Sequence, residues 1–363
     1  MIASLFMIIG RSLRRHALST TVTVLSAALA SGLVMAVFSI SLQSSKAFSG
    51  GRVGFDAVLG ARGSKLQLVM NTVYHLDTSP GNISWAHYER IKDDPRVKLA
   101  IPYAVGDNFK GYRIVGTTTD LFTKFEYQAG KSFEIRAPGI VFDPGRREAV
   151  LGATAARELG LRHNDDFHPT HGVSGSPTAK HHHEHYKVVG IMKPTNSPSD
   201  RVIWIPVEGT YHMEGHTGRN EHGEEVEASP QQGVPMEFRQ LSAVMLKLTG
   251  GQAAISINYD YANNHTDTTL AWPIAQEMAG LMRKLGWVNK ILELIAYLVV
   301  GVAAGSLLAS LYNTMNERRR EFAILRALGA RRSTVFSVIV LEACSIAALG
   351  ALVGYAMPAA LSS

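Results

Sequence analysis

Residues 316–332 read Asn-Glu-Arg-Arg-Arg-Glu-Phe-Ala-Ile-Leu-Arg-Ala-Leu-Gly-Ala-Arg-Arg, a basic amphipathic segment between two long apolar runs. The run before it, Leu294 to Met315, has no charged residue. At about 1.5 Å per residue it is long enough to cross roughly 30 Å of hydrocarbon. The six arginines of the segment lie where the positive-inside rule places the cytoplasm. The sequence therefore predicts a transmembrane helix over 287–315 and a cytoplasmic loop over 316–332.

A second apolar run opens the chain. Residues 17–45 contain no ionisable side chain and follow Arg11, Arg14 and Arg15, so we predict a transmembrane helix that enters from the cytoplasmic side. The alternative is a cleaved signal peptide ending near Ala28-Leu29-Ala30. Apolar sequence continues through residues 32–38, whereas a cleaved signal is normally followed by a polar mature start. Residues 1–16 are apolar and basic enough to form an interfacial helix on the membrane.

The third apolar run, residues 333–360, is interrupted only by Glu342 and predicts another transmembrane helix. An acidic side chain within a span is costly in lipid, so Glu342 is expected to be a packed structural residue or part of an ion pathway. The two pairs Gly301/Gly305 and Gly350/Gly354 have the small-xxx-small spacing that lets membrane helices approach closely.

The basic character of the chain is concentrated at these membrane boundaries. The sequence pI is 9.3 and the net charge +6. Arg11, Arg14 and Arg15 contribute +3, and the six arginines and two glutamates of the loop contribute +4, which together exceed that total. The remainder lacks a basic patch for phosphate, so the charge indicates membrane topology and contact with lipid rather than nucleic-acid binding.

Between the first two spans lies a polar insert, residues 46–286, which the topology places outside the cytoplasm. Its short apolar runs alternate with helical patterns and predict an α+β fold. The only cysteine of the chain, Cys344, excludes an intrachain disulfide. The expected strands are 97–101, 112–116, 186–191, 202–205 and 243–248. Helices are expected over 83–92, 148–161 and 274–285, the last continuing into the second span.

Three motifs near the C-terminus have a recognisable arrangement: Glu317-Arg318 followed by Glu321, then Leu325-Arg326-Ala327-Leu328-Gly329-Ala330, then Leu341-Glu342-Ala343. They resemble the FtsX-like permease domain of MacB-type (type VII, mechanotransmission) ABC transporters. The insert resembles the MacB-type periplasmic domain at Val115-Gly116-Thr117-Thr118, Ala129-Gly130-Lys131-Ser132-Phe133, Ala149-Val150-Leu151-Gly152 with Ala156-Arg157-Glu158-Leu159-Gly160, and Tyr186-Lys187-Val188-Val189-Gly190-Ile191.

The resemblance implies an α-helical membrane protein with a large extracytoplasmic α+β domain, located in the bacterial inner membrane. It also implies a second permease chain, a cytosolic ABC ATPase that holds ATP and Mg²⁺, and a periplasmic or outer-envelope partner. The residues that would couple to the ATPase are Glu317, Arg318, Arg319, Arg320, Glu321, Arg326, Arg331 and Arg332. The family has four spans and three are visible here. Either the sequence is a piece of a longer protein, or transport through a smaller bundle is in doubt.

The sequence does not predict an enzyme. Ala129-Gly130-Lys131-Ser132 ends like a P-loop, but Phe125 stands where that motif needs its first glycine. The acidic pairs Asp93-Asp94 and Asp165-Asp166 are typical of solvated turns. We therefore assign no catalytic residue and no cofactor bound by this chain for nucleotide chemistry.

Histidine is the unusual residue of the insert. Ten of the fourteen lie within residues 163–222: His163, His168, His171, His181, His182, His183, His185, His212, His216 and His222. Imidazole interspersed with carboxylate suits zinc, nickel or copper(II). The spacing defines no closed tetrahedral site, and the surrounding glycine, proline and serine equally fit a solvated loop with a pH-dependent charge. His75 and His87 are expected to be ordinary packing or surface residues.

Two functions fit these observations. The first is a permease subunit that transmits ATP-driven motion to the outer domain for export or extraction of an envelope substrate, with the histidine-rich region linking this work to metal. The alternative is a non-transporting envelope sensor or regulator whose histidine-rich domain binds metal.

Overall fold

The computed structural model describes residues 17–48, 54–172, 182–220, 222–229, 231–317, 319–327, 329 and 331–361. The predicted interfacial helix over 1–16 lies outside this set. The chain divides into two compact units, one formed by Met1–Lys46 with Met282–Ser363 and the other by Ala47–Leu281. We call them the membrane unit and the α+β domain.

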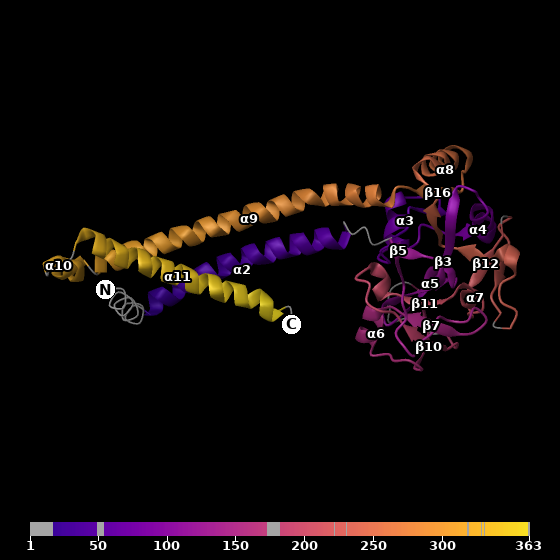
Figure 1. Cartoon of the computed structure of the whole chain (residues 1–363), viewed down its shortest axis with the longest axis horizontal. Helices are drawn as coiled ribbons and strands as arrows, with labels where there is room; N and C mark the ends of the chain where they lie inside the picture. The colour runs from indigo at the N-terminus through magenta and orange to yellow at the C-terminus, as the bar shows by residue number, and fades with distance from the viewer. Residues whose placement is uncertain are drawn as a thin grey trace. The chain divides into compact units, whose positions relative to one another are not determined.

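The membrane unit contains three long apolar helices among the described residues: α2 (Ala17–Phe48), α9 (Ile274–Glu317) and α11 (Arg332–Leu361) (Figure 1). By length and composition they can cross a membrane over Thr20–Ser39, Ile274–Ala309 and Val335–Ala356. The short helix α10 (Arg319–Ala327) lies between α9 and α11 in the chain. Helix α9 is continuous from Ile274, as expected for the segment 274–285.

Helices α2 and α11 approach each other through small residues. A Cβ atom added to Gly354 would lie 2.5 Å from the carbonyl oxygen of Ala28, and one added to Gly350 would lie 2.5 Å from the Cβ atom of Ala27. Ser31 Oγ donates a hydrogen bond to the Gly350 carbonyl oxygen at 3.5 Å. Only glycine allows the two backbones to come this close.

The second small-residue pair has a different environment. A Cβ atom at Gly301 or Gly305 of α9 would meet no described atom within 4 Å. These two glycines therefore do not line a helix contact within the described part of the chain. The side chain of Glu342 is not among those described, so its predicted role stays a prediction.

The α+β domain is built on one ten-stranded sheet with the order β16-β1-β15-β3-β4-β11-β7-β10-β8, and β9 pairs with β3. The long central strand β3 pairs with β15 through its first half and with β4 and β9 through its second. The strands are β1 (Ala57–Ala61), β3 (Val97–Phe109), β4 (Tyr112–Thr117), β7 (Glu148–Leu151), β8 (Asp166–Phe167), β9 (Thr170–His171), β10 (Tyr186–Ile191), β11 (Ile203–Pro206), β15 (Ala243–Leu248) and β16 (Thr268–Ala271).

Short helices and three two-stranded pairs complete the domain. The helices are α3 (Lys65–Thr72), α4 (Trp85–Lys92), α5 (Asp120–Thr123), α6 (Ala153–Leu159), α7 (Val207–Thr210) and α8 (Gly251–Asn264), with 3-10 turns at Pro198–Arg201 and Met236–Phe238. The pairs are β2 (Ile83–Ser84) with β14 (Gln240–Leu241), β5 (Glu126–Gln128) with β6 (Lys131–Ser132), and β12 (Thr217–Arg219) with β13 (Glu225–Glu227).

The sheet is buried on both faces. On β15, Met245 packs into one core with Trp204, while Val244 and Leu246 pack into another with Leu59. A strand covered on both sides needs apolar residues at nearly every position, and β15 is apolar from Ala243 to Leu246 before the half-buried Lys247.

The five strand predictions are confirmed, and β3 continues well past residue 101. The helix predicted over 148–161 is wrong in its first part, because Glu148–Leu151 is strand β7, between β10 and β11. Gly152 then caps α6, and a Cβ atom there would lie 2.6 Å from the Ser199 carbonyl oxygen. The helix predicted over 83–92 begins at Trp85, since Ser84 is extended.

His75 is a packed residue whose ring carries no positive charge in the fold. Its ring lies 5.7 Å from that of Trp204, and Nδ1 is buried with no hydrogen-bond partner among the described residues. Burial, with the nearby positive charge of Arg113, lowers the pKa of His75 to about 3. In the unfolded chain His75 takes up a proton near pH 6.5, whereas in the fold its ring stays neutral until about pH 3. Lowering the pH from 6.5 toward 3 therefore favours the unfolded chain, and above pH 6.5 this loss of stability is absent.

The lowered pKa of His75 predicts that the fold loses stability in acid. Because His75 keeps some exposed surface, we expect it to account for about 1–2 kcal/mol of the stability lost between pH 7.5 and 5. The measurement is the thermal unfolding midpoint of the full chain in detergent at pH 7.5 and at pH 5. Between these pH values the midpoint should fall further in the parent than in His75→Asn. Asparagine is chosen because it tolerates the positive φ of 56° at this position. Equal drops in the two proteins would contradict the assignment.

Candidate functional site

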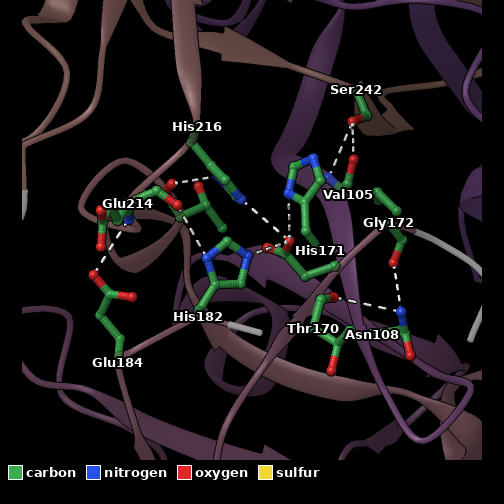
Figure 2. Close-up of polar contacts among 12 residues, drawn as sticks. Val105, Asn108, Thr170, His171, Gly172, His182, Glu184, Glu214, His216 and Ser242 are labelled. Carbon is green, nitrogen blue, oxygen red and sulfur yellow. Dashed lines mark hydrogen bonds and ion pairs between the residues drawn. The ribbon is translucent and has the colours of Figure 1, made fainter. Parts of the chain in front are cut away.

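Three of the predicted histidines converge with one aspartate in the α+β domain. One potential ligand atom from each of Asp107, His171, His182 and His216 lies within 4.8 Å of the others. Figure 2 shows the rings of His171, His182 and His216 close together, and a nitrogen of each lies within 3.5 Å of Asp107 Oδ1. The ring centroids are 5.2 Å apart for His182 and His216, 5.6 Å for His171 and His182, and 5.4 Å for His171 and His216. We call these four residues the His/Asp cluster.

A β-bulge places the aspartate. The register between β3 and β4 shifts between Val105 and Asp107, which leaves Gly106 as the extra residue. Such bulges redirect the side chain that follows them. Strand β9 then pairs with β3 so that His171 lies opposite Asp107. Asn108 holds β9 in place, because its Nδ2 donates to the Gly172 carbonyl oxygen at 2.7 Å (Figure 2).

His182 and His216 are each held through their other ring nitrogen. His182 Nδ1 lies 3.1 Å from the Glu214 carbonyl oxygen, and His216 Nδ1 lies 2.8 Å from the Thr210 carbonyl oxygen. Both Nε2 atoms lie 3.1 Å from Asp107 Oδ1. The Glu214 backbone is itself held by Glu184, whose Oε1 accepts from the Glu214 N–H at 3.2 Å. The rings are therefore fixed with Nε2 toward the aspartate.

The cluster is buried except at one histidine. Exposed side-chain fractions are 3% for Asp107, 4% for His182 and 17% for His216, but 53% for His171, whose Nδ1 lies 3.5 Å from Asp107 Oδ1. Burial alone would raise the pKa of the Asp107 carboxyl, whereas a proton on any of the three histidine nitrogens beside it would lower that pKa. The cluster therefore places a buried carboxyl group within reach of three imidazoles, a donor set suited to zinc.

The other predicted histidines lie elsewhere. His183 and His185 are exposed, and the rings of His168 and His185 contact each other at 6.1 Å between centroids. Outside the cluster also lie His163, His212 and the exposed His222, while His181 is not among the described residues. His87, expected to be ordinary, is buried and its Nε2 lies 2.7 Å from Asp267 Oδ2.

Sequence reasoning missed Asp107. It stands far from the histidine-rich region, and its one sequence signal is the polar Gly106-Asp107-Asn108 directly after an apolar strand.

The predicted coupling residues lie in and around α10. The side chains of Arg319, Arg320 and Arg326 are exposed, as are Arg331 and Arg332 beyond the helix. The helix ends at Ala327, and the φ of 95° at Gly329, with its N–H donating to the Arg326 carbonyl oxygen at 3.1 Å, is typical of the residues that follow a helix C-terminus. Arg318 and the side chains of Glu317 and Glu321 are not among those described.

Comparisons with known proteins assign both parts of the chain to domains of the same transporter family. Residues 20–256, well over half of the chain, match the family model of the MacB-like periplasmic core domain. Residues 293–363 match the model of the FtsX-like permease C-terminal domain. Among the curated proteins, none matches the chain by sequence.

Two solved structures are similar at low identity. One is the extracellular domain of the noncanonic ABC-type transporter YknZ from Gram-positive bacteria, with 13% identity over 59% of this chain and 99% of that chain and a TM-score of 0.32. The other is the periplasmic region of MacB from Actinobacillus actinomycetemcomitans, with 9% identity over 64% of this chain and 94% of that chain and a TM-score of 0.38. The family assignment rests on the two family models.

Proposed function

Because the chain belongs to the family of ABC-transporter membrane permeases with a MacB-like periplasmic core domain and an FtsX-like C-terminal domain, we propose that it is the permease subunit of an ATP-driven mechanotransmission complex in the bacterial inner membrane. Permeases of this family work with cytosolic ABC ATPases. In this proposal the ATPase partner holds ATP and Mg²⁺, a second permease chain completes the complex, and the α+β domain is periplasmic.

The contact with the ATPase is assigned to residues 316–332. An exposed basic helix between two membrane-spanning helices is a suitable docking element, since Arg319, Arg320 and Arg326 face solvent on α10. The proposed coupling residues are Glu317, Arg318, Arg319, Arg320, Glu321, Arg326, Arg331 and Arg332. Movement of the ATPases would displace α10 and, through it, the end of α9.

Helix α9 carries the proposal, because it is one continuous helix from Ile274 to Glu317. Its first residues belong to the α+β domain and its remainder to the membrane unit. A stiff element that changes position as a whole can transmit displacement between two sites. The work done in the periplasm would be export or extraction of an envelope substrate, aided by a periplasmic or outer-envelope partner and linked to metal through the His/Asp cluster.

Charge reversal on α10 tests the docking. In the variant Arg319→Glu/Arg320→Glu, α10 would repel the ATPase surface on which the proposal places it. Close charge pairs at interfaces couple by about 1.5–7 kcal/mol, so the effect should be large. Co-purification of the ATPase should fall at least about 10-fold, which corresponds to 1.4 kcal/mol. The matched control is Arg283→Glu/Lys284→Glu, an exposed basic pair near the other end of α9. Protease accessibility would verify insertion in both variants. ATPase recovery equal to the parent would count against docking on α10.

The His/Asp cluster favours a second candidate function, that of a non-transporting envelope sensor or regulator. A buried carboxyl group beside two fixed imidazoles and one exposed imidazole gives the domain a site that can respond to a ligand without moving a substrate. Energy-dependent loss of a substrate from the membrane or periplasm would support the transporter. A change in the activity of a partner protein, with no substrate moved, would support the sensor.

A further inference from the structure

The hydrogen-bond pattern of the His/Asp cluster is unbalanced without a cation. His182 Nδ1 and His216 Nδ1 both face backbone carbonyl oxygens, which only accept hydrogen bonds, so both Nδ1 atoms carry a proton. In a neutral ring the remaining nitrogen, Nε2, then has a lone pair. Both Nε2 atoms lie 3.1 Å from the same oxygen, Asp107 Oδ1, which is also an acceptor when the carboxylate is ionised.

Extra protons alone do not satisfy the two Nε2 lone pairs that face Asp107. One proton on Asp107 could serve only one of the two rings. Protonation of both rings would place two positive charges against one carboxylate, at a ring spacing of 5.2 Å and on side chains that are only 4% and 17% exposed. A net positive charge would then be buried, which is unfavourable. A divalent ion accepts all the lone pairs at once and leaves the imidazoles neutral, with both Nδ1–H groups still donating to their carbonyl oxygens.

We propose that Asp107, His171, His182 and His216 bind a divalent transition-metal ion of the zinc class in the α+β domain. Three imidazole nitrogens and one carboxylate oxygen match the number and kind of ligands that zinc takes. The same donors discriminate against Mg²⁺ and Ca²⁺, which prefer oxygen ligands. The proposal rests on the contacts of these four residues and does not depend on the transport function proposed above.

One side of the site is open. A cavity of about 230 Å³ is lined by Asp107, His171 and His216, together with Tyr211, Gln240 and Ser242. His171 is the most exposed of the four ligands. Asp107, His182 and His216 therefore form the fixed part of the site, and His171 is the ligand that can be displaced. This gives the ion a path to exchange, and space beside it for a small metal-binding molecule.

Metal binding would also join distant segments of the domain. The four ligands come from strand β3, from strand β9, from the stretch before β10 and from the loop between α7 and β12. An ion that binds only the folded arrangement stabilises it in proportion to its affinity and concentration. Zinc should therefore raise the thermal midpoint of the full chain.

The test is a metal titration of the full chain, purified in detergent and stripped with a chelator. Co²⁺ in place of Zn²⁺ reports coordination by its visible absorption, and competition with a chromogenic chelator gives the affinity for Zn²⁺. We expect one tightly held ion per chain. Asp107→Asn, which keeps the shape of the side chain, and His182→Ala should each weaken binding at least about 100-fold, since loss of supporting groups alone costs 10- to 100-fold.

The matched control is His183→Ala/His185→Ala, which removes two exposed histidines beside the cluster and should change the affinity less than about twofold. If a buried variant does not fold, the exposed His171→Ala provides the test: it should alter the Co²⁺ spectrum and weaken binding about 10-fold. Weak binding whose stoichiometry follows the number of histidines would overturn the proposal. So would equal losses in the control and cluster variants, or a His171→Ala spectrum identical to that of the parent.

Discussion

A seven-residue glycine-serine insertion between Gly286 and Trp287 is expected to abolish work in the periplasm while ATP hydrolysis by the complex continues. Helix α9 runs for 44 residues, which is about 66 Å at 1.5 Å per residue. A Gly/Ser segment behaves as a flexible coil and transmits displacement poorly. The measurement is the ratio of substrate released or exported to ATP hydrolysed in reconstituted complex, and we expect this ratio to fall at least about 10-fold.

A helical insertion provides the control. Seven alanine- and glutamate-rich residues at the same position add about two helical turns, so the helix stays stiff and keeps its phase to within about 20°. This variant should retain most of the coupling ratio. If the flexible insertion keeps hydrolysis and work as tightly linked as in the parent, α9 does not act as the transmitting element.

The second large effect is expected at the contact between α2 and α11. Gly354→Leu would force a side chain against the backbone of α2, where even a Cβ atom meets Ala28, Ser31 and Gly32. Overpacking of a tight contact costs about 1–3 kcal/mol, and in this case the rigid backbone on the other side keeps the cost at the upper end. Thermal unfolding and protease resistance of the full chain in detergent should both fall.

Gly301→Leu on α9 is the matched control, because a Cβ atom there meets no described atom within 4 Å. Replacing glycine within a helix should by itself add up to about 1 kcal/mol of stability. The control should thus be neutral or slightly stabilising in the isolated chain. Equal destabilisation by the two substitutions would mean that membrane insertion, and not the contact with α2, determines the effect of a bulky residue.

Most of the architecture could be predicted from hydrophobic pattern. The three spanning helices correspond to long runs of apolar sequence, and residues 243–246 of β15 are all apolar because both sheet faces are buried. The pattern failed at 148–161, where an apolar strand and a short helix follow each other with only Gly152 between them. Strands of two residues, such as β8 and β9, exist only through their pairing with distant segments and leave no periodic signal.

The site was predictable in part. Composition pointed to metal chemistry in residues 163–222, but composition does not tell which histidines meet. His182 is buried in the cluster while its neighbour His183 is exposed, and the two are equivalent in sequence. Asp107 reaches the cluster because of a bulge in β3, and a bulge depends on the pairing of strands rather than on local sequence.

The central claim is that ATP moves the periplasmic domain through α9. It can be measured directly with a fluorophore at Lys131→Cys, an exposed position on β6, in a Cys344→Ser background that removes the only native cysteine. Energy transfer to acceptor lipids in a nanodisc reports the distance between the domain and the bilayer. We predict that trapping the ATPase in its ATP-bound state shifts this distance in the parent and in the helical-insertion variant but not in the glycine-serine variant. An unchanged distance in the parent between the nucleotide-free and ATP-bound states would contradict the account.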